Sequence, residues 1–194
     1  MTRALIVIDM QRAFDDLDFW GQTANPDCEA NVTALTAAWV GSGEPIVVVR
    51  HDSVSAGSPL HPASPGNALI DAVAAVEPAL FVTKNVNSAF YGDPDLHAWL
   101  TDRGITELVV CGIQTNMCVE TTARMAGNLG YDVTVALDAT RTFDLQADVA
   151  GMGLITRTAA ELMATTALDL QAGGFARIAT TAELAVSQTS GTRT

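Results

Sequence analysis

LVVCGIQTNMCVETTA, residues 108–123, is the stretch that decides the fold of this chain. It begins as a continuous apolar run of the length of a buried strand, and the run breaks at Gly112. After this glycine, apolar residues recur at helical spacing until Gly130, a residue type that commonly ends helices. The stretch therefore predicts a buried strand that leads directly into a helix.

Cys118 is the candidate nucleophile in this stretch. Thr115 or Asn116 is expected to cap the helix, which places Cys118 in its first turn. Unpaired backbone N–H groups and the helix dipole favour a thiolate there. A free cysteine is by default a small buried apolar residue, and Cys28 and Cys111 are interpreted in that way. Cys118 differs only if the chain also brings a base and a cation to it.

The remaining chain alternates between apolar strand-like runs and helical patterns. We expect the other strands at residues 3–9, 45–50, 80–83, 131–137 and 175–180. Six such strands predict an α/β fold of three layers, with a six-stranded parallel sheet and helices on both faces. Residues 1–186 are predicted to form a single domain, and residues 187–194 a polar C-terminal tail. Residues 141–157 show no clean period and are interpreted as a loop over the site, whose mobility the sequence leaves open.

Composition narrows the classes of function. The chain has 194 residues, 48% of them hydrophobic, with 10 basic and 22 acidic residues and a net charge of −12. This acidity argues against nucleic acid or an anionic membrane as a partner. The sequence shows no secretory signal and no membrane-spanning run, and its three scattered cysteines are typical of a reducing cytoplasm. The Gly-Ser-Gly of residues 41–43 follows a helix, so it is no dinucleotide fingerprint, and no cofactor is expected.

Two charged residues follow predicted strands and complete a candidate site. Asp9 ends the first strand and Lys84 ends the third. Taken alone, Asp9 is typical of an acid at a turn, and Lys84 of a solvated surface lysine. The carboxyl ends of parallel strands meet at one edge of the sheet, so we expect Asp9, Lys84 and Cys118 in one crevice.

A metal site is the alternative interpretation of the second strand's end. His51 and Asp52 follow that strand, and His61 lies in the next loop. Metal ligands normally come as three or more groups at defined spacing, which these residues do not show. We therefore expect His51 and Asp52 to be a hydrogen-bonded pair that holds the loop, and no metal.

Three motifs resemble those of one enzyme family. They are VIDMQRAF at residues 7–14, KNVNSAF at residues 84–90, and GIQTNMCVETTA at residues 112–123. In this order and spacing they resemble the isochorismatase-like cysteine hydrolases, a family that includes nicotinamidases, N-carbamoylsarcosine amidohydrolases, ureidoacrylate amidohydrolases and streptothricin hydrolases. The resemblance covers about residues 3–185.

The resemblance implies a catalytic triad of Asp9, Lys84 and Cys118. It also implies a cis peptide between Ile113 and Gln114, and an oxyanion hole formed by the backbone N–H groups of Gln114 and Cys118. The expected activity is hydrolysis of a C–N bond in a small amide, lactam or carbamoyl compound through a thioester. The substrate and its leaving group stay open.

The resemblance also sets expectations for the pocket and for assembly. The pocket residues are predicted to be Phe14, Trp20, Asn87, Phe90 and Ile113. Family members commonly form oligomers, so we expect a homo-oligomer, a dimer or a tetramer, with the aromatic segment near Trp20 or Trp39 as a candidate interface.

Departures from the family pattern keep alternatives open. RHDS at residues 50–53 does not reproduce the Asp-x-His metal motif of nicotinamidases, which disfavours nicotinamide and metal together. Isochorismatases proper generally lack the cysteine, so vinyl-ether hydrolysis is a weaker alternative. A catalytically silent binding or scaffold protein and a redox-sensing thiol protein are the others.

Overall fold

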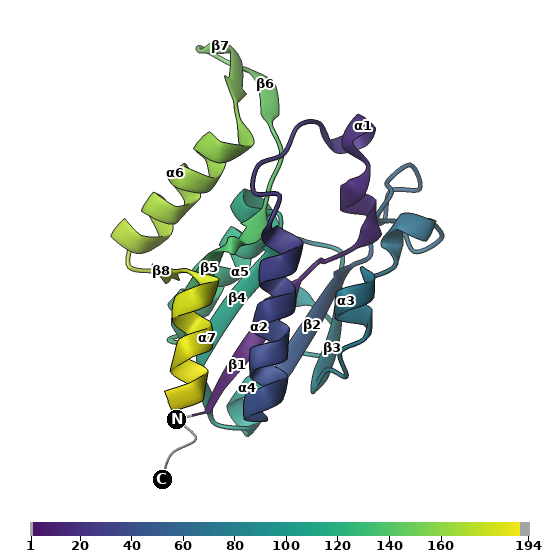
Figure 1. Ribbon diagram of the computed structural model, residues 1–194. Helices are drawn as coiled ribbons and strands as arrows, with labels where there is room; N and C mark the ends of the chain where they lie inside the picture. Colours follow the sequence, from purple (N-terminus) through teal and green to yellow (C-terminus); the bar gives the residue numbers. More distant parts are fainter. Residues whose placement is uncertain (1, 191–194) are drawn as a thin grey trace.

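A six-stranded parallel sheet forms the centre of the computed structural model, which describes residues 2–190 (Figure 1). Its strands are β1 (Thr2–Ile8), β2 (Ile46–His51), β3 (Leu80–Lys84), β4 (Ile105–Ile113), β5 (Asp132–Arg141) and β8 (Arg177–Ala179). They lie in the order β3-β2-β1-β4-β5-β8, and each neighbouring pair is parallel. The predicted sheet is confirmed, although its last strand is shorter than residues 175–180.

Helices cover both faces of the sheet and complete three layers. One face packs against α2 (Cys28–Ser42), α3 (Asp71–Ala74) and α7 (Thr181–Ser190). The other packs against α4 (Leu96–Asp102), α5 (Glu120–Asn128) and α6 (Ala159–Ala172). A short helix, α1 (Leu17–Trp20), follows β1, and α7 continues to Ser190, past the predicted tail boundary at residue 187. Residues 191–194 of that predicted tail lie outside the described residues.

Alternation along β1 shows why the central strands read as continuous apolar runs. Leu5 and Val7 point to the α2 side of the sheet, while Ala4, Ile6 and Ile8 point to the α5 side. All five are fully buried. A parallel strand between two helical layers needs apolar side chains on both faces, so no polar residue interrupts the run.

Strand register brings the carboxyl ends of the central strands to one edge. Ile8 is paired with Val49 of β2 and with Gly112 of β4, and His51 is paired with Lys84 of β3. Gly112 has a φ of +119°, and a Cβ there would overlap the carbonyl oxygen of Ile8. Only glycine permits this conformation and this close approach of β4 to β1.

Residues 141–157 differ from the predicted loop. They contain an antiparallel hairpin of β6 (Leu145–Val149) and β7 (Gly153–Arg157), which projects from the body beyond α6 (Figure 1). Nearly all of its residues are exposed. With no buried face the hairpin has no alternation of apolar and polar residues, and so it carries no sequence signal of a strand.

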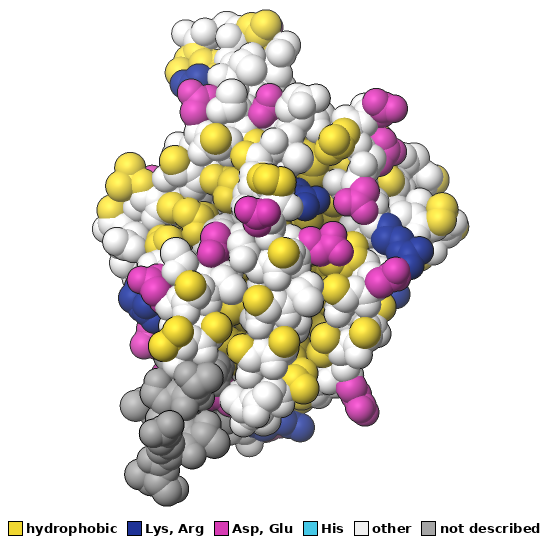
Figure 2. All heavy atoms as spheres, viewed as in Figure 1, with side chains coloured by type: hydrophobic (Ala, Val, Ile, Leu, Met, Phe, Trp, Pro, Cys, Tyr) yellow, Lys and Arg dark blue, Asp and Glu magenta, His cyan; other side chains and the backbone are white. Residues whose placement is uncertain are grey.

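The surface agrees with the acidic composition. Figure 2 shows Asp and Glu side chains scattered over the viewed face, with few Lys and Arg. Within residues 2–190, no helix combines the length and the apolar character that crossing a membrane requires.

Candidate active site

Lys84 lies at the centre of the candidate site, at the carboxyl end of β3. Its Nζ is 2.5 Å from Asp9 Oδ2, 3.3 Å from Cys118 Sγ and 3.1 Å from His51 Nδ1. The whole side chain is buried, with none of it exposed to solvent. The structure thus brings together the acid, the amine and the thiol that the sequence placed at strand ends, and it adds a histidine to them.

Asp9 directly follows β1 and bends the chain away from the sheet. Its φ is +51°, and its N–H donates to the carbonyl of Val49 at 2.9 Å. Burial raises the pKa of the Asp9 carboxyl, and the adjacent Lys84 amine opposes that rise. Oδ2 accepts from Lys84, whereas the buried Oδ1 has no hydrogen-bond partner among residues 2–190. An unpaired buried carboxylate oxygen is costly, so Oδ1 is suited to accept a proton or a substrate N–H.

Cys118 lies one turn before the helix that was predicted to hold it. Residues Thr115–Val119 form a π-helical turn, η4, and α5 begins only at Glu120. Neither predicted capping side chain caps this helix. Thr115 Oγ1 donates to Thr140 Oγ1 at 2.9 Å, and Asn116 Oδ1 accepts from Thr142 Oγ1 at 2.5 Å. That prediction is wrong because β5 supplies better partners from outside the turn.

The thiol of Cys118 is 8% exposed, and its protonation differs from the expectation. Burial is the largest influence and the charge of Asp9 adds to it, so that the pKa of Cys118 rises to about 12 in spite of the Lys84 amine. The sequence had predicted a lowered thiol pKa from the helix dipole, and the burial found here outweighs that effect. The resting group is a neutral thiol beside an Asp9–Lys84 ion pair.

His51 ends β2 and is clamped through its backbone. Its N–H donates to Gln11 Oε1 at 2.9 Å, and Gln11 Nε2 donates back to its carbonyl at 3.0 Å. Burial and the nearby Lys84 amine lower the pKa of His51 to about 4, so the imidazole is neutral at neutral pH. Sequence reasoning missed both roles, although Gln11 lies within the first family-like motif.

The three residues of the metal alternative do not converge. Asp52 forms a bidentate ion pair with Arg50 at 2.8 and 2.9 Å and accepts from Asn67 at 2.9 Å. His61 Nδ1 accepts from the backbone N–H of Ala63 at 3.1 Å. Asp52 therefore pairs with Arg50 and Asn67, and the expected hydrogen bond between Asp52 and His51 is not among the contacts of the described residues.

A different trio does bring its ligand atoms together. Donor atoms of Asp9, His51 and Cys118 lie within 4.8 Å of one another. However, the Lys84 ammonium already contacts all three. A metal cation between them would stand against a positive charge and compete for the same lone pairs, so this donor set does not fit a metal.

A cavity of about 320 Å³ opens onto these groups. Its lining consists of Asp9, Phe14, Trp20, His51, Ser58, Leu60, Asn87, Gln114, Met117, Cys118, Phe143 and Leu145. Among the predicted pocket residues, Phe14, Trp20 and Asn87 thus lie in its wall, as does Gln114, whose peptide bond to Ile113 is cis as the resemblance implied.

Phe90 and Ile113 do not line the cavity, which corrects two predicted positions. Phe90 packs beside Tyr131 and His97, with ring centroids 5.9 and 6.5 Å away, in the α5-side core. Ile113 is 2% exposed and belongs to the α2-side core. Both lie close in sequence to site residues, but their side chains point into the helical layers.

Aromatic rings form one wall of the cavity. Phe14, Trp20 and Phe143 have ring centroids 4.9, 6.0 and 5.6 Å apart, and Trp20 Nε1 donates to the carbonyl of Ala13 at 2.8 Å. Phe143 was missed in the sequence, although its position just after β5 was a usable signal. No Lys or Arg side chain lines this cavity, so its wall is apolar and its floor holds the buried ion pair. Trp39 is fully buried under α2 and contributes to no surface of the described chain, contrary to the predicted interface.

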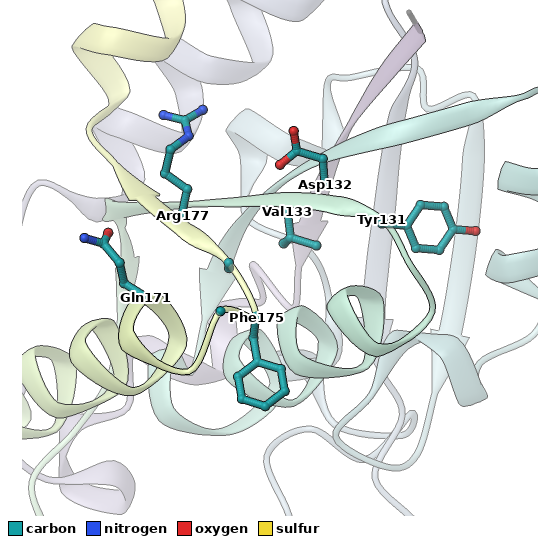
Figure 3. A pocket seen from close by; sticks show the side chains of 8 residues that line it. Tyr131, Asp132, Val133, Gln171, Phe175 and Arg177 are labelled. Carbon is teal, nitrogen blue, oxygen red and sulfur yellow. The ribbon is translucent and has the colours of Figure 1, made fainter.

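A second hollow, of about 300 Å³, lies at the opposite edge of the sheet, at the amino ends of β5 and β8 (Figure 3). Tyr131, Asp132, Phe175 and Arg177 are among its lining residues, and Arg177 donates to Thr134 Oγ1 at 3.0 Å. Its lining includes no thiol and no amine. The chemistry-bearing groups therefore gather at the first cavity.

Comparison with known proteins gives a consistent assignment. The model of the isochorismatase domain family matches residues 3–167. The uncharacterized isochorismatase family protein YrdC of Bacillus subtilis is 37% identical over 144 residues, which cover 74% of this chain and 76% of that protein.

Solved structures agree with this assignment. A Chromobacterium violaceum protein described as a hydrolase of the isochorismatase family superposes with a TM-score of 0.88 at 36% identity, covering 97% of this chain and 94% of that one. A structure named cysteine hydrolase, from Pseudomonas syringae, gives a TM-score of 0.82 at 26% identity and covers 97% and 92% of the two chains.

Proposed function

We propose, because this chain belongs to the isochorismatase family of hydrolases, that it is a cysteine-dependent amidohydrolase acting on a small uncharged amide, lactam or carbamoyl compound. The observation that carries the proposal is the contact of one buried lysine amine with both a carboxylate and a thiol at the floor of a cavity. Asp9, Lys84 and Cys118 are the proposed catalytic residues.

The first step is proton transfer followed by attack. The Cys118 thiol gives its proton to Asp9, and the thiolate adds to the substrate carbonyl. Because the resting thiol pKa is about 12, the thiolate arises only as the carboxylate accepts the proton. The Lys84 ammonium lies 3.3 Å from the sulfur and stabilises the anion while it forms.

The oxyanion of the tetrahedral intermediate is assigned to the backbone N–H groups of Gln114 and Cys118. Donors of this kind contribute about 3 kcal/mol each at comparable sites. Protonated Asp9 then gives its proton to the leaving nitrogen as the C–N bond breaks, which leaves a thioester on Cys118. A water that loses its proton to Asp9 attacks the thioester, and the second collapse releases the acid and restores the thiol.

The cavity supports a substrate that is small, uncharged and flat on one side. A volume of about 320 Å³ suits a small molecule. The Phe14, Trp20 and Phe143 rings offer an apolar wall for a planar group. Since no cationic side chain lines the cavity, nothing in it pairs with the carboxylates of isochorismate. Vinyl-ether hydrolysis is the weaker alternative for this reason, beyond the presence of the cysteine.

Amine or ammonia release across a panel of small amides tests the proposal. Wild-type enzyme is expected to turn over uncharged aromatic or cyclic amides, and Cys118→Ala to reduce kcat by at least about a thousandfold with its circular dichroism unchanged. A thioester of Cys118 trapped by acid quench and found by mass spectrometry would support the covalent step. Turnover by Cys118→Ala comparable to wild type would refute it, and no turnover of any amide would favour the silent scaffold.

A further inference from the structure

His51 uses one ring nitrogen on Lys84 and turns the other side of the ring to the cavity. Its Nδ1 lies 3.1 Å from Lys84 Nζ, and His51 is among the residues that line the cavity. No hydrogen bond of Nε2 to any of residues 2–190 is recorded, whereas the backbone N–H and carbonyl of His51 are both taken up by Gln11. The ring is therefore held in place while one polar atom stays available.

The lysine decides which ring nitrogen carries the proton. An ammonium donates and never accepts, so Nδ1 opposite Lys84 has to be a bare acceptor. The ring is neutral at neutral pH because burial and the Lys84 charge disfavour its protonated form. A neutral imidazole without a proton on Nδ1 carries it on Nε2, which makes Nε2 a donor.

We propose that His51 is a substrate-binding residue whose Nε2–H, held in this tautomer by Lys84, donates a hydrogen bond to a second acceptor atom next to the scissile carbonyl. The inference rests on the proposed amidohydrolase function and adds a substrate feature to it. A ring nitrogen of His51 and the sulfur of Cys118 lie within 4.8 Å of each other, so an atom adjacent to a carbonyl under attack is within reach of the imidazole.

The predicted preference is for amides that carry an oxygen or nitrogen acceptor one or two bonds from the carbonyl carbon, as carbamoyl compounds and 2-heteroaryl carboxamides do. An analogue without that acceptor leaves the Nε2–H unpaired in the complex, and an unmade hydrogen bond in a site is penalised. Picolinamide and benzamide form a matched pair, because they differ only by a ring nitrogen in place of a C–H beside the carboxamide.

Protection of Cys118 from iodoacetamide measures binding of this pair without requiring turnover. At one mildly alkaline pH, picolinamide is expected to protect wild-type enzyme at about a tenfold lower concentration than benzamide. Each variant is normalised to its own rate without ligand. His51→Asn keeps an acceptor near the Nδ1 position but has no atom at Nε2, so it should lose the preference. His51→Gln extends an amide N–H to that position and should recover part of it. His61→Asn, a histidine outside the cavity, should keep the wild-type ratio.

Nitrogen-15 NMR of the histidine rings gives a second readout that is independent of substrate. His51 is expected to show a protonated Nε2 and a bare Nδ1 in wild type, and a mixture of tautomers in Lys84→Met. A protonated Nδ1 in wild type, equal protection by the two amides, no protection by picolinamide, or an unchanged preference in His51→Asn would each overturn the inference. Absence of turnover in wild type would count against the proposed amidohydrolase, while the tautomer and the protection ratio would still decide the role of His51.

Discussion

Lys84 Nζ lies 2.5 Å from Asp9 Oδ2, and the two side chains are 0% and 1% exposed. A buried ion pair of this kind is weak evidence for stability, because removing both charges from water costs about as much as their attraction returns. The pair is better explained by the chemistry it permits. It keeps a negatively charged base next to a thiol whose own pKa burial has raised.

Breaking this pair from one side is expected to destabilise the protein strongly. Lys84→Met leaves the Asp9 carboxylate buried without a cation and should lower the free energy of unfolding by about 3–5 kcal/mol. The double variant Asp9→Asn/Lys84→Met removes both charges and should recover part of that loss. Urea denaturation of the wild type, both single variants and the double variant measures the coupling. A double variant that loses the sum of both single effects would show that the two side chains do not interact.

Alkylation of Cys118 should report a protonated resting thiol. With a thiol pKa of about 12, the reactive thiolate fraction rises about tenfold per pH unit, so the rate should climb from neutral to alkaline pH without a plateau. Mass spectrometry after iodoacetamide treatment follows the modified peptide, with Cys118→Ala as the background from the buried Cys28 and Cys111. A plateau near neutral pH would show instead the lowered pKa that the helix dipole alone predicts.

His51 should make stability depend on pH in the acid range. Its pKa is lowered from 6.5 to about 4 on folding, so the folded state favours the neutral ring and the unfolded chain binds the proton more readily. This contribution is fully present above pH 6.5 and is lost as the pH falls from 6.5 toward 4. His51→Asn has no such group, so the difference in Tm between it and wild type should shift against wild type across that window. A constant difference would contradict the lowered pKa.

Trp20 should contribute to substrate binding more than to folding. It is partly exposed, lines the cavity and packs against Phe14 and Phe143. Trp20→Ala is expected to raise the KM of an aromatic amide about tenfold with a smaller change in kcat, because the lost contact acts on ground state and transition state alike. Trp99→Ala, in α4 on the other face of the sheet, is the matched control and should leave KM unchanged. Equal KM values for the two variants would exclude Trp20 from the binding wall.

Assembly stays a prediction, and the hairpin of β6 and β7 is where we expect a second copy of the chain to bind. Met152 and Leu154 on it are 69% and 66% exposed, and Leu145 at its base also lines the cavity. An isolated two-stranded hairpin is marginally stable in water, which favours a covering partner. Light scattering coupled to gel filtration should show a dimer or tetramer for wild type and a smaller species for Met152→Ser/Leu154→Ser. A monomeric wild type would refute this.

Much of the fold could be predicted because it depends on local patterns. The apolar runs that became β1 and β4 and the helical spacing after Gly112 are properties of neighbouring residues. The convergence of Asp9 and Lys84 with Cys118 followed from one rule about parallel sheets, namely that the carboxyl ends of neighbouring strands share an edge.

The sequence by itself thus determined the parallel sheet and which acid, amine and thiol meet at its edge. Only the tertiary structure decided the direction of each site chain and how deeply it is buried. Phe90 and Ile113 turned into the helical layers, Phe143 entered the cavity wall, and the thiol of Cys118 was raised in pKa rather than lowered. The physical reason is that orientation and burial depend on contacts between residues far apart in the chain, and burial outweighs the local field of a helix end.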